Sequence, residues 1–222
     1  MKTLLVLAHP EPKSFNGALF CEAESVLRRA GHDVRTSDLY AMKFNPVSGR
    51  TNFTVAKDPD YFQQQAEEAN AVATGGFASD VEAEWKKLAW CDLMVWQFPL
   101  WWFGPPAILK GWADKVLAMG RAWGMGHMYD TGLLKGKRAL VSVTTGGPAE
   151  AYVPGGFSGD IHSILRVVHR GIFRFTGMDV LAPHIIYSPA HLTDAERKRH
   201  LREFAKRLMT IDREKPIEVG NF

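Results

Sequence analysis

Residues 93–106 read LMVWQFPLWWFGPP. The apolar run from Leu93 to Trp96 predicts a buried strand. The prolines and the glycine that follow break regular structure, so the aromatic residues among them are expected in a loop directly after this strand. In a parallel sheet flanked by helices, such a loop lies at the carboxyl edge of the sheet, which is where these proteins bind their ligands.

Other apolar runs predict further strands, and helical patterns separate them. Strands are expected at residues 4–8, 34–39, 139–143 and 180–187, the last interrupted near Pro183. Helices are expected at residues 16–30, 62–70, 79–88, 107–119, 160–174 and 194–209. This alternation predicts an α/β fold, with a doubly wound five-stranded parallel sheet and helices on both faces. We expect one domain over residues 1–222.

Residues 43–79 do not follow the alternating pattern. They contain turn signals at Asn45-Pro46, Ser48-Gly49, Asp58-Pro59 and Gly75-Gly76, around one short helical piece. A long irregular segment in a compact domain is usually functional or part of a subunit interface, and we expect one of these roles here.

The composition argues against several classes of protein. Hydrophobic residues make up 46% of the chain, and the net charge of +3 with scattered basic residues does not indicate nucleic-acid binding. No apolar stretch approaches the roughly 20 residues of a membrane helix. Cys21 and Cys91 are expected to be free thiols, and the histidines lack the spacing of metal ligands. We therefore expect a cytoplasmic protein with no integral membrane segment and no metal site.

Three loops follow the ends of the first, third and fourth strands. The first ends in Ser14-Phe15-Asn16 beside Lys13, where free N–H groups and the helix dipole suit a phosphate; a plain helix cap is the alternative. The second holds the aromatic cluster, which suits stacking on a flat ligand. The third is Thr144-Thr145-Gly146-Gly147, whose backbone can approach a ligand closely, although a simple glycine turn would use the same residues. Together they predict a flavin site.

Six blocks of sequence, spread over nearly the whole chain, carry a resemblance to a known family. They are Ala8-His9 with Ser14-Phe15-Asn16, SDLYAM at 37–42 with Phe44-Asn45-Pro46, QFPL at 97–100, WFG at 102–104, PAILKGW at 106–112 and TTGG at 144–147. The chain resembles the NAD(P)H:quinone oxidoreductase family of the DT-diaphorase type. The resemblance implies a flavodoxin-like fold, FAD rather than FMN as cofactor, NAD(P)H as reductant, a quinone-like acceptor and a homodimer.

The same resemblance assigns individual residues to the site. The cofactor would contact His9, Lys13, Ser14, Phe15, Asn16, Gln63, Pro99, Leu100, Trp102, Phe103, Thr144, Thr145, Gly146, Gly147, Tyr152 and Arg197. The substrate would contact Trp102, Phe103, Trp123, Met125, Phe175 and His191. In the family, the positions of Phe175 and His191 line the catalytic pocket from the partner subunit, near the dimer interface.

One departure concerns the residues that stabilise charge on the cofactor. Tyr152 and the Gly147 N–H are the expected donors, but the histidine that assists the tyrosine in the family is replaced here by Ser158. Serine does not titrate near neutral pH, whereas histidine does. His162 is one helical turn beyond Ser158 if the helix begins there, so it is the candidate substitute and the third expected catalytic residue.

The reaction expected from the resemblance is two-electron transfer. Hydride passes from NAD(P)H to the flavin, and a quinone-like acceptor then uses the same pocket, which imposes a ping-pong cycle. An electron carrier of the flavodoxin type is usually shorter and acidic, which the charge of +3 does not match. A regulatory flavoprotein subunit of a potassium-efflux system and an azo- or nitro-reductase remain as alternatives.

Overall fold

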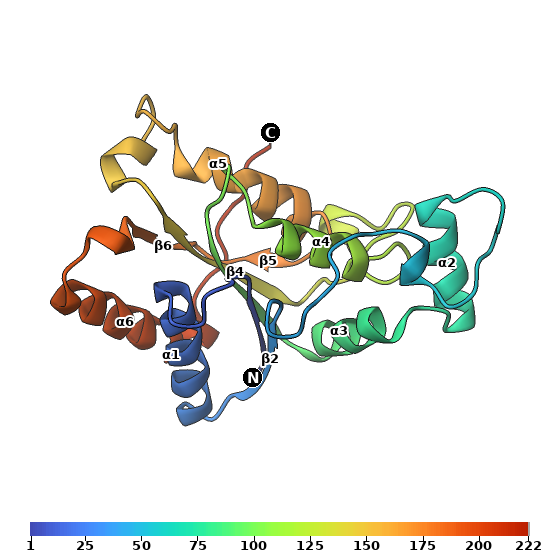
Figure 1. Cartoon of the computed structure of the whole chain (residues 1–222), viewed down its shortest axis with the longest axis horizontal. Coiled ribbons are helices and arrows are strands. Elements are labelled where there is room, and N and C mark those ends of the chain that lie inside the picture. Colours follow the sequence, from blue (N-terminus) through green and yellow to red (C-terminus); the bar gives the residue numbers. More distant parts are fainter. Residues whose placement is uncertain (222) are drawn as a thin grey trace.

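The computed structural model describes residues 1–221, and its centre is a parallel sheet (Figure 1). The strands are β1 Lys2–Leu7, β2 Asp33–Asp38, β3 Leu93–Pro99, β4 Arg138–Thr145, β5 Asp179–Val180 and β6 His184–Tyr187. Their order is β2-β1-β3-β4-β5, and β6 also pairs with β4. The expected flavodoxin-like α/β fold is confirmed.

The sheet changes winding direction beside β1. The chain leaves β1 to form β2 on one side, whereas β3 pairs on the other side, so Val6 lies between Ser37 and Trp96. The loops after β1 and β3 therefore diverge at their carboxyl ends and leave a crevice between them. β2 is the outer strand on its side, and β1 is its only partner among the described strands.

Helices cover both faces of the sheet (Figure 1). They are α1 Phe15–Arg29, α2 Gln64–Thr74, α3 Ser79–Trp90, α4 Ala107–Val116, α5 Ile161–Val168 and α6 Asp194–Leu208. On one face, Leu19 of α1 and Phe204 of α6 pack in one apolar core with Val95 of β3. On the other face, Leu109 of α4 and Leu165 of α5 belong to a second core. Burying both faces explains the apolar runs of the central strands β1 and β3.

The fifth strand position is split, as its sequence predicts. β5 pairs with β4 at Arg138 and Ala139, and β6 pairs with it from Ser142 to Thr145. Proline has no backbone N–H to give to a neighbouring strand, which accounts for the interruption near Pro183. The split places Tyr187 directly opposite Thr145, at the carboxyl edge of the sheet.

Several predicted helix bounds are wrong. The helix expected at 62–70 is α2, which begins at Gln64 and continues to Thr74, where Gly75 ends it with φ 69°. The helix expected to reach residue 119 ends at Val116, and the indole N–H of Trp123 donates to the carbonyl of Leu117 at 3.0 Å. This bond satisfies one of the carbonyls that a helix end leaves free.

The helix expected at 160–174 is an α-helix only to Val168, and a π-helix continues it from His169 to Arg174. The capping box predicted at the start of the last helix is present, because Thr193 and Glu196 bond each other's backbone N–H groups. Within residues 1–221, no helix has the length and apolar character needed to cross a membrane.

Candidate active site

A cavity of about 700 Å³ lies at the carboxyl edge of the sheet, between the loops after β1, β3 and β4 and the start of α6. Of the residues predicted to bind the cofactor, it is lined by His9, Lys13, Ser14, Phe15, Asn16, Pro99, Leu100, Thr144, Thr145, Gly146 and Arg197. It is also lined by Trp101 of the predicted aromatic cluster and by residues that the sequence did not single out: Ala18, Ser188, Pro189, Ala190, Asp194, Lys198 and Leu201. The three predicted loops therefore meet at one site.

The first loop is folded tightly onto the start of α1. A side chain at Gly17 would place its Cβ 2.1 Å from the carbonyl oxygen of Pro12, so only glycine fits there. The Ser14 hydroxyl accepts the N–H of Gly17 at 3.1 Å. Ser14 thus caps the helix and also lines the cavity, and the prediction that this loop binds a phosphate stays untested. The capped N-terminus presents backbone N–H groups and the positive end of its dipole to a ligand.

A buried hydrogen-bonded chain joins three elements below the cavity. The Asn16 side-chain amide of α1 donates to the Thr144 hydroxyl of β4 at 2.9 Å. The Gln97 amide of β3 donates to the Asn16 oxygen at 2.8 Å. All three side chains are buried, so each of these bonds is costly to leave unmade. The chain fixes the relative positions of the loops that line the cavity.

The second loop is a tight aromatic turn. Trp101 and Gly104 exchange two backbone hydrogen bonds of 3.0 Å, and the two residues between them have φ values of 50° and 58°. Those residues, Trp102 and Phe103, are 98% and 55% exposed and do not line the cavity of this chain. Trp101 lines it instead, with its ring 6.2 Å from that of His9. Sequence reasoning had assigned the wall to the neighbouring tryptophan.

The third loop is held open. The N–H of Ser188 donates to the carbonyl of Thr145 at 3.0 Å, and its hydroxyl donates to the carbonyl of Gly146 at 3.2 Å. Ser188 has φ 46°, an uncommon conformation for a residue with a side chain. A Cβ at Gly146 would meet no atom within 4 Å. The backbone of Gly146 is therefore free for close approach by a ligand.

Tyr152 is buried beside the third loop. It is 8% exposed, and its ring lies 3.2 Å from where a Cβ of Gly147 would stand. On its other side, the Tyr187 ring lies with its centroid 5.9 Å away and tilted by 39°. Sequence reasoning missed Tyr187, because only the pairing of β6 with β4 brings it to this place.

The helical turn expected to connect Ser158 with His162 is absent. α5 begins at Ile161, and Asp160 caps it by accepting the N–H groups of His162 and Ser163. Ser158 lies before the helix, where its N–H donates to the carbonyl of Ala151 at 2.8 Å. His162 is exposed. The structural reason for proposing His162 is thus wrong, and its role stays an untested prediction.

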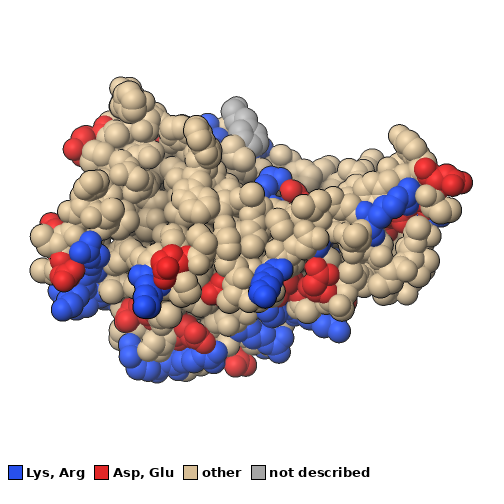
Figure 2. Space-filling model, viewed as in Figure 1, with Lys and Arg blue, Asp and Glu red and all other residues tan. Residues whose placement is uncertain are grey.

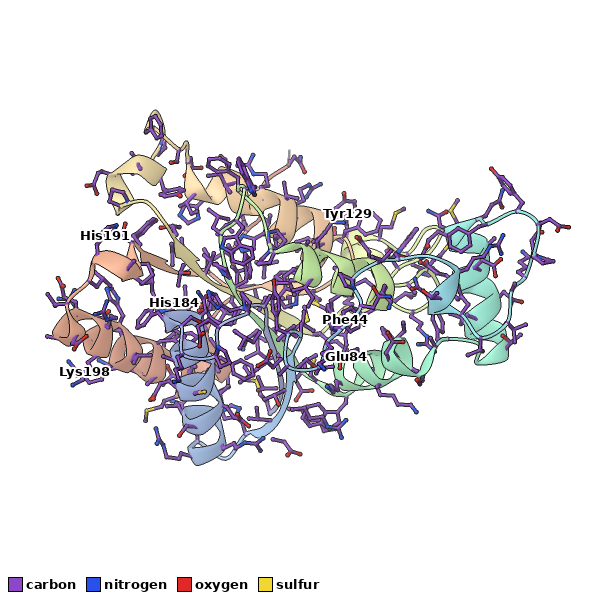
Figure 3. The ribbon with its side chains drawn as sticks, viewed as in Figure 1. Phe44, Glu84, Tyr129, His184, His191 and Lys198 are labelled. Atoms are coloured by element: carbon purple, nitrogen blue, oxygen red, sulfur yellow. The ribbon has the colours of Figure 1, made fainter. Side chains whose placement is uncertain are left out.

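The far end of the cavity is positively charged. The Arg197 guanidinium donates to the carbonyl of Pro189 at 3.0 Å and pairs with Asp194 at 2.8 Å. Lys198 and Lys13 add two further cations to the lining. Figure 3 shows Lys198 on α6 and His191 at the same end of the molecule. This end suits the phosphates of an extended ligand.

The remaining predicted site residues lie elsewhere in this chain. Trp123 and Phe175 line a second cavity of about 350 Å³, with ring centroids 5.4 Å apart. Gln63 precedes α2 in a separate depression. Met125 is exposed, and His191 is exposed beside the residues of the first cavity. Phe175 also contacts Tyr129, which Figure 3 shows far from His191. One chain therefore does not bring its predicted cofactor and substrate residues together.

Two buried groups near the sheet have shifted pKa values, but they lie outside the cavity. Burial lowers the pKa of His184 to about 4, helped by the charges of Arg207 and His200. Burial also lowers the pKa of His169 to about 4. Among residues 1–221, no group of three or more His, Cys, Asp or Glu side chains is arranged to hold a metal ion.

The fold and the crevice define a class of flavodoxin-like α/β proteins, and comparison with known proteins agrees. A family model described as having a flavodoxin-like fold matches residues 1–208, so the chain belongs to this family.

Its relatives include the ribosyldihydronicotinamide dehydrogenase (quinone) of Homo sapiens, 45% identical over 97% of this chain and 94% of that protein. The NAD(P)H dehydrogenase (quinone) 1 of Rattus norvegicus is 43% identical over 97% and 79%. A crystal structure described as a candidate quinone reductase from Klebsiella pneumoniae superposes with a TM-score of 0.92 and 38% identity, covering 98% of this chain and 87% of that one. These relatives confirm the resemblance found in the sequence.

Proposed function

We propose that the protein is a flavin-dependent NAD(P)H:quinone oxidoreductase. One observation carries the proposal: a single cavity joins a capped helix N-terminus and a basic end to a glycine backbone that is open to close approach. A phosphate at one end and a flat ring at the other match this arrangement. The 43% identical rat relative is named for this activity, and the 45% identical human relative is named as a quinone-linked dehydrogenase of ribosyldihydronicotinamide.

The lining fits a flavin, and its cations on α6 favour FAD over FMN. Ser14 and the start of α1 would hold the first phosphate, whereas Arg197, Lys198 and Leu201 lie along α6 beyond it. The second phosphate and the adenosine of FAD would give the basic end a ligand.

A bound flavin supplies the hydride chemistry, and the protein supplies position and electrostatics. The Thr145 hydroxyl donates to the carbonyl of Gly147 at 2.8 Å and stiffens the loop. We infer that the Gly147 N–H and the Tyr152 hydroxyl donate hydrogen bonds to the polar edge of the ring, where negative charge develops during the reaction. Trp101 and Leu100 would exclude water from one side of the cavity.

We also propose that the active enzyme is a homodimer with shared sites. Trp123 and Phe175 line the second cavity, apart from Gly146 and the rest of the first. A partner subunit can supply them to the first cavity if the two chains pack around a twofold axis. The exposed aromatic turn of Trp102 and Phe103 is the kind of apolar surface that usually marks such contacts.

The decisive experiment is the absorbance spectrum of the purified protein, followed by mass analysis of the cofactor released by heat. We expect a flavin spectrum, about one FAD per chain, and bleaching by NADH or NADPH under anaerobic conditions. Reoxidation by a simple benzoquinone, compared with an azo dye and a nitroaromatic compound, then ranks the acceptors. Release of FMN alone would show that the cofactor is FMN and not FAD, and the proposal of a flavin enzyme would stand. Failure to bind either flavin would overturn the proposal.

A further inference from the structure

Tyr187 occupies a position at the site that no motif assigns. It is the last residue of β6 and lies opposite Thr145, the residue that precedes the Gly146-Gly147 loop. The next residue, Ser188, bonds Thr145 and Gly146 through its N–H and its hydroxyl. Two hydrogen bonds of Ser188 thus hold the end of β6, which carries Tyr187, against the strand and loop that a ring-shaped ligand would contact.

The Tyr187 side chain packs behind Tyr152. Their ring centroids are 5.9 Å apart, and the Tyr152 ring in turn lies 3.2 Å from where a Cβ of Gly147 would stand, so Tyr152 contacts both Tyr187 and the loop. Within residues 1–221, the Tyr152 hydroxyl makes no hydrogen bond to another residue, and Tyr152 belongs to a short 3-10 turn, Ala149–Tyr152. A single turn of this kind does not fix a side chain by itself, so its ring orientation depends on what packs against it.

The electrostatic surroundings keep Tyr187 neutral. Partial burial raises its pKa, and the charge of Asp160 raises it further. Asp160 caps α5 and carries its charge at the other side of Tyr187, where its own pKa is lowered by the hydroxyl of Ser163. A neutral ring can pack against Tyr152 without changing its state over the working pH range.

We propose that Tyr187 is a positioning residue whose flat ring holds Tyr152 over Gly147, in place of an assisting side chain at Ser158. The inference rests on the proposed function, because Tyr152 acts there on a bound flavin. It requires the ring of Tyr187 and not its hydroxyl, since no hydrogen bond joins the two tyrosines in the structure. Tyr187→Phe should therefore behave like the native protein, whereas Tyr187→Leu should not.

The test is a double-substitution cycle with two readouts. The first is the dissociation constant of FAD for the cofactor-free protein, measured by fluorescence quenching; the second is the rate of flavin reduction by NADH in a stopped-flow instrument. Tyr187→Leu should weaken FAD binding and slow flavin reduction, each on the order of tenfold. Tyr187→Phe should leave both quantities at their native values. In a Tyr152→Phe background, Tyr187→Leu should have little further effect, because the residue acts through the Tyr152 hydroxyl.

Thermal unfolding of each cofactor-free variant separates positioning from loss of the fold. If Tyr187→Leu does not fold, Tyr187→Met offers a flexible side chain that fills the same space without a flat ring. The inference is overturned if the effects of Tyr187→Leu and Tyr152→Phe simply add, or if Tyr187→Phe is as impaired as Tyr187→Leu. If the native protein binds no flavin, the proposed function itself fails, so the two failures are distinguishable.

Discussion

At the scale of single residues, a substitution at Gly146 should affect ligand binding without affecting folding. A Cβ there meets no protein atom within 4 Å, and its backbone is not in the left-handed region. Gly146→Ala should leave the melting temperature of the cofactor-free protein unchanged. It should weaken FAD binding about tenfold or more, because a methyl group would stand where the flavin ring approaches.

Gly49→Ala is the matched control, because a Cβ at Gly49 also meets no atom but lies away from the cavity. It should change neither the melting temperature nor the affinity for FAD. If Gly146→Ala binds FAD as tightly as the native protein, then the ring does not lie against this loop and the proposed site is wrong.

His184 predicts a pH dependence of stability. It is stacked on Phe204 with ring centroids 4.3 Å apart, its Nε2 has no hydrogen-bond partner, and its pKa is about 4. In the unfolded chain a histidine has a pKa of about 6.5, so between these values the unfolded state binds more protons. The stabilisation is complete above pH 6.5 and is lost as the pH falls to 4, an effect of about 3 kcal/mol.

His184→Phe keeps the stacking and removes the titration. Its free energy of unfolding, measured with urea between pH 7 and pH 4, should fall less steeply than that of the native protein. His127→Gln changes an exposed histidine and should leave the native pH dependence intact. Parallel pH curves for the native protein and His184→Phe would contradict the prediction.

At the scale of elements, the aromatic turn exposes two bulky side chains at a cost in folding stability. Trp102 and Phe103 both have positive φ in a two-residue hairpin turn, which favours Asn-Gly. Replacing them by Asn and Gly should raise the free energy of unfolding by about 1–2 kcal/mol, because bulky residues are strained there. The same change should lower quinone reduction. Trp102→Phe keeps an aromatic ring and the strain, so it should change neither quantity much.

The result is informative in either direction. A more stable variant with full activity would mean that the exposed rings contribute nothing to the site. An unchanged melting temperature would mean that the turn is not strained.

The same turn shows what the sequence could and could not predict. The apolar run at 93–96 and the proline-rich loop after it were enough to place a strand and a ligand loop, because these signals are local. The place of Trp101 in the cavity lining was not predictable, because it depends on two positive φ angles, and the prediction that Trp102 walls the cofactor stays untested. Tyr187 was missed for a related reason, since only long-range strand pairing places it beside Tyr152.

At the scale of the whole molecule, charge is unevenly distributed. Figure 2 shows Lys and Arg side chains gathered over α6 and α1, whereas the part of this face above them carries few charged side chains. The shared-site dimer requires that the weakly charged aromatic parts of the chain become buried and the basic end stay accessible to the cofactor. This requirement can be tested by combining two defective chains.

A chain carrying Gly146→Val should no longer bind the cofactor in its first cavity. A chain carrying Trp123→Ala and Phe175→Ala should no longer supply these two rings to its partner's site. Each alone should be inactive. When the two are co-expressed and purified together, mixed dimers hold one intact site, so about a quarter of the native activity should return. Mixing two chains that both carry Gly146→Val should return none. Light scattering that reports only monomers, or no recovery in the mixed sample, would contradict the shared site.

The outer strand β2 has a consequence for handling the protein at high concentration. A strand with an open side offers unpaired N–H and C=O groups on which another chain can add a strand, the first step toward fibrils. β2 has six residues, and its sequence DVRTSD places charges at Asp33, Arg35 and Asp38. Arg35 lies over the ring of Trp90 at 4.1 Å and stays exposed. This short, charged border disfavours edge-to-edge aggregation, so the sheet can remain open on this side without a covering helix.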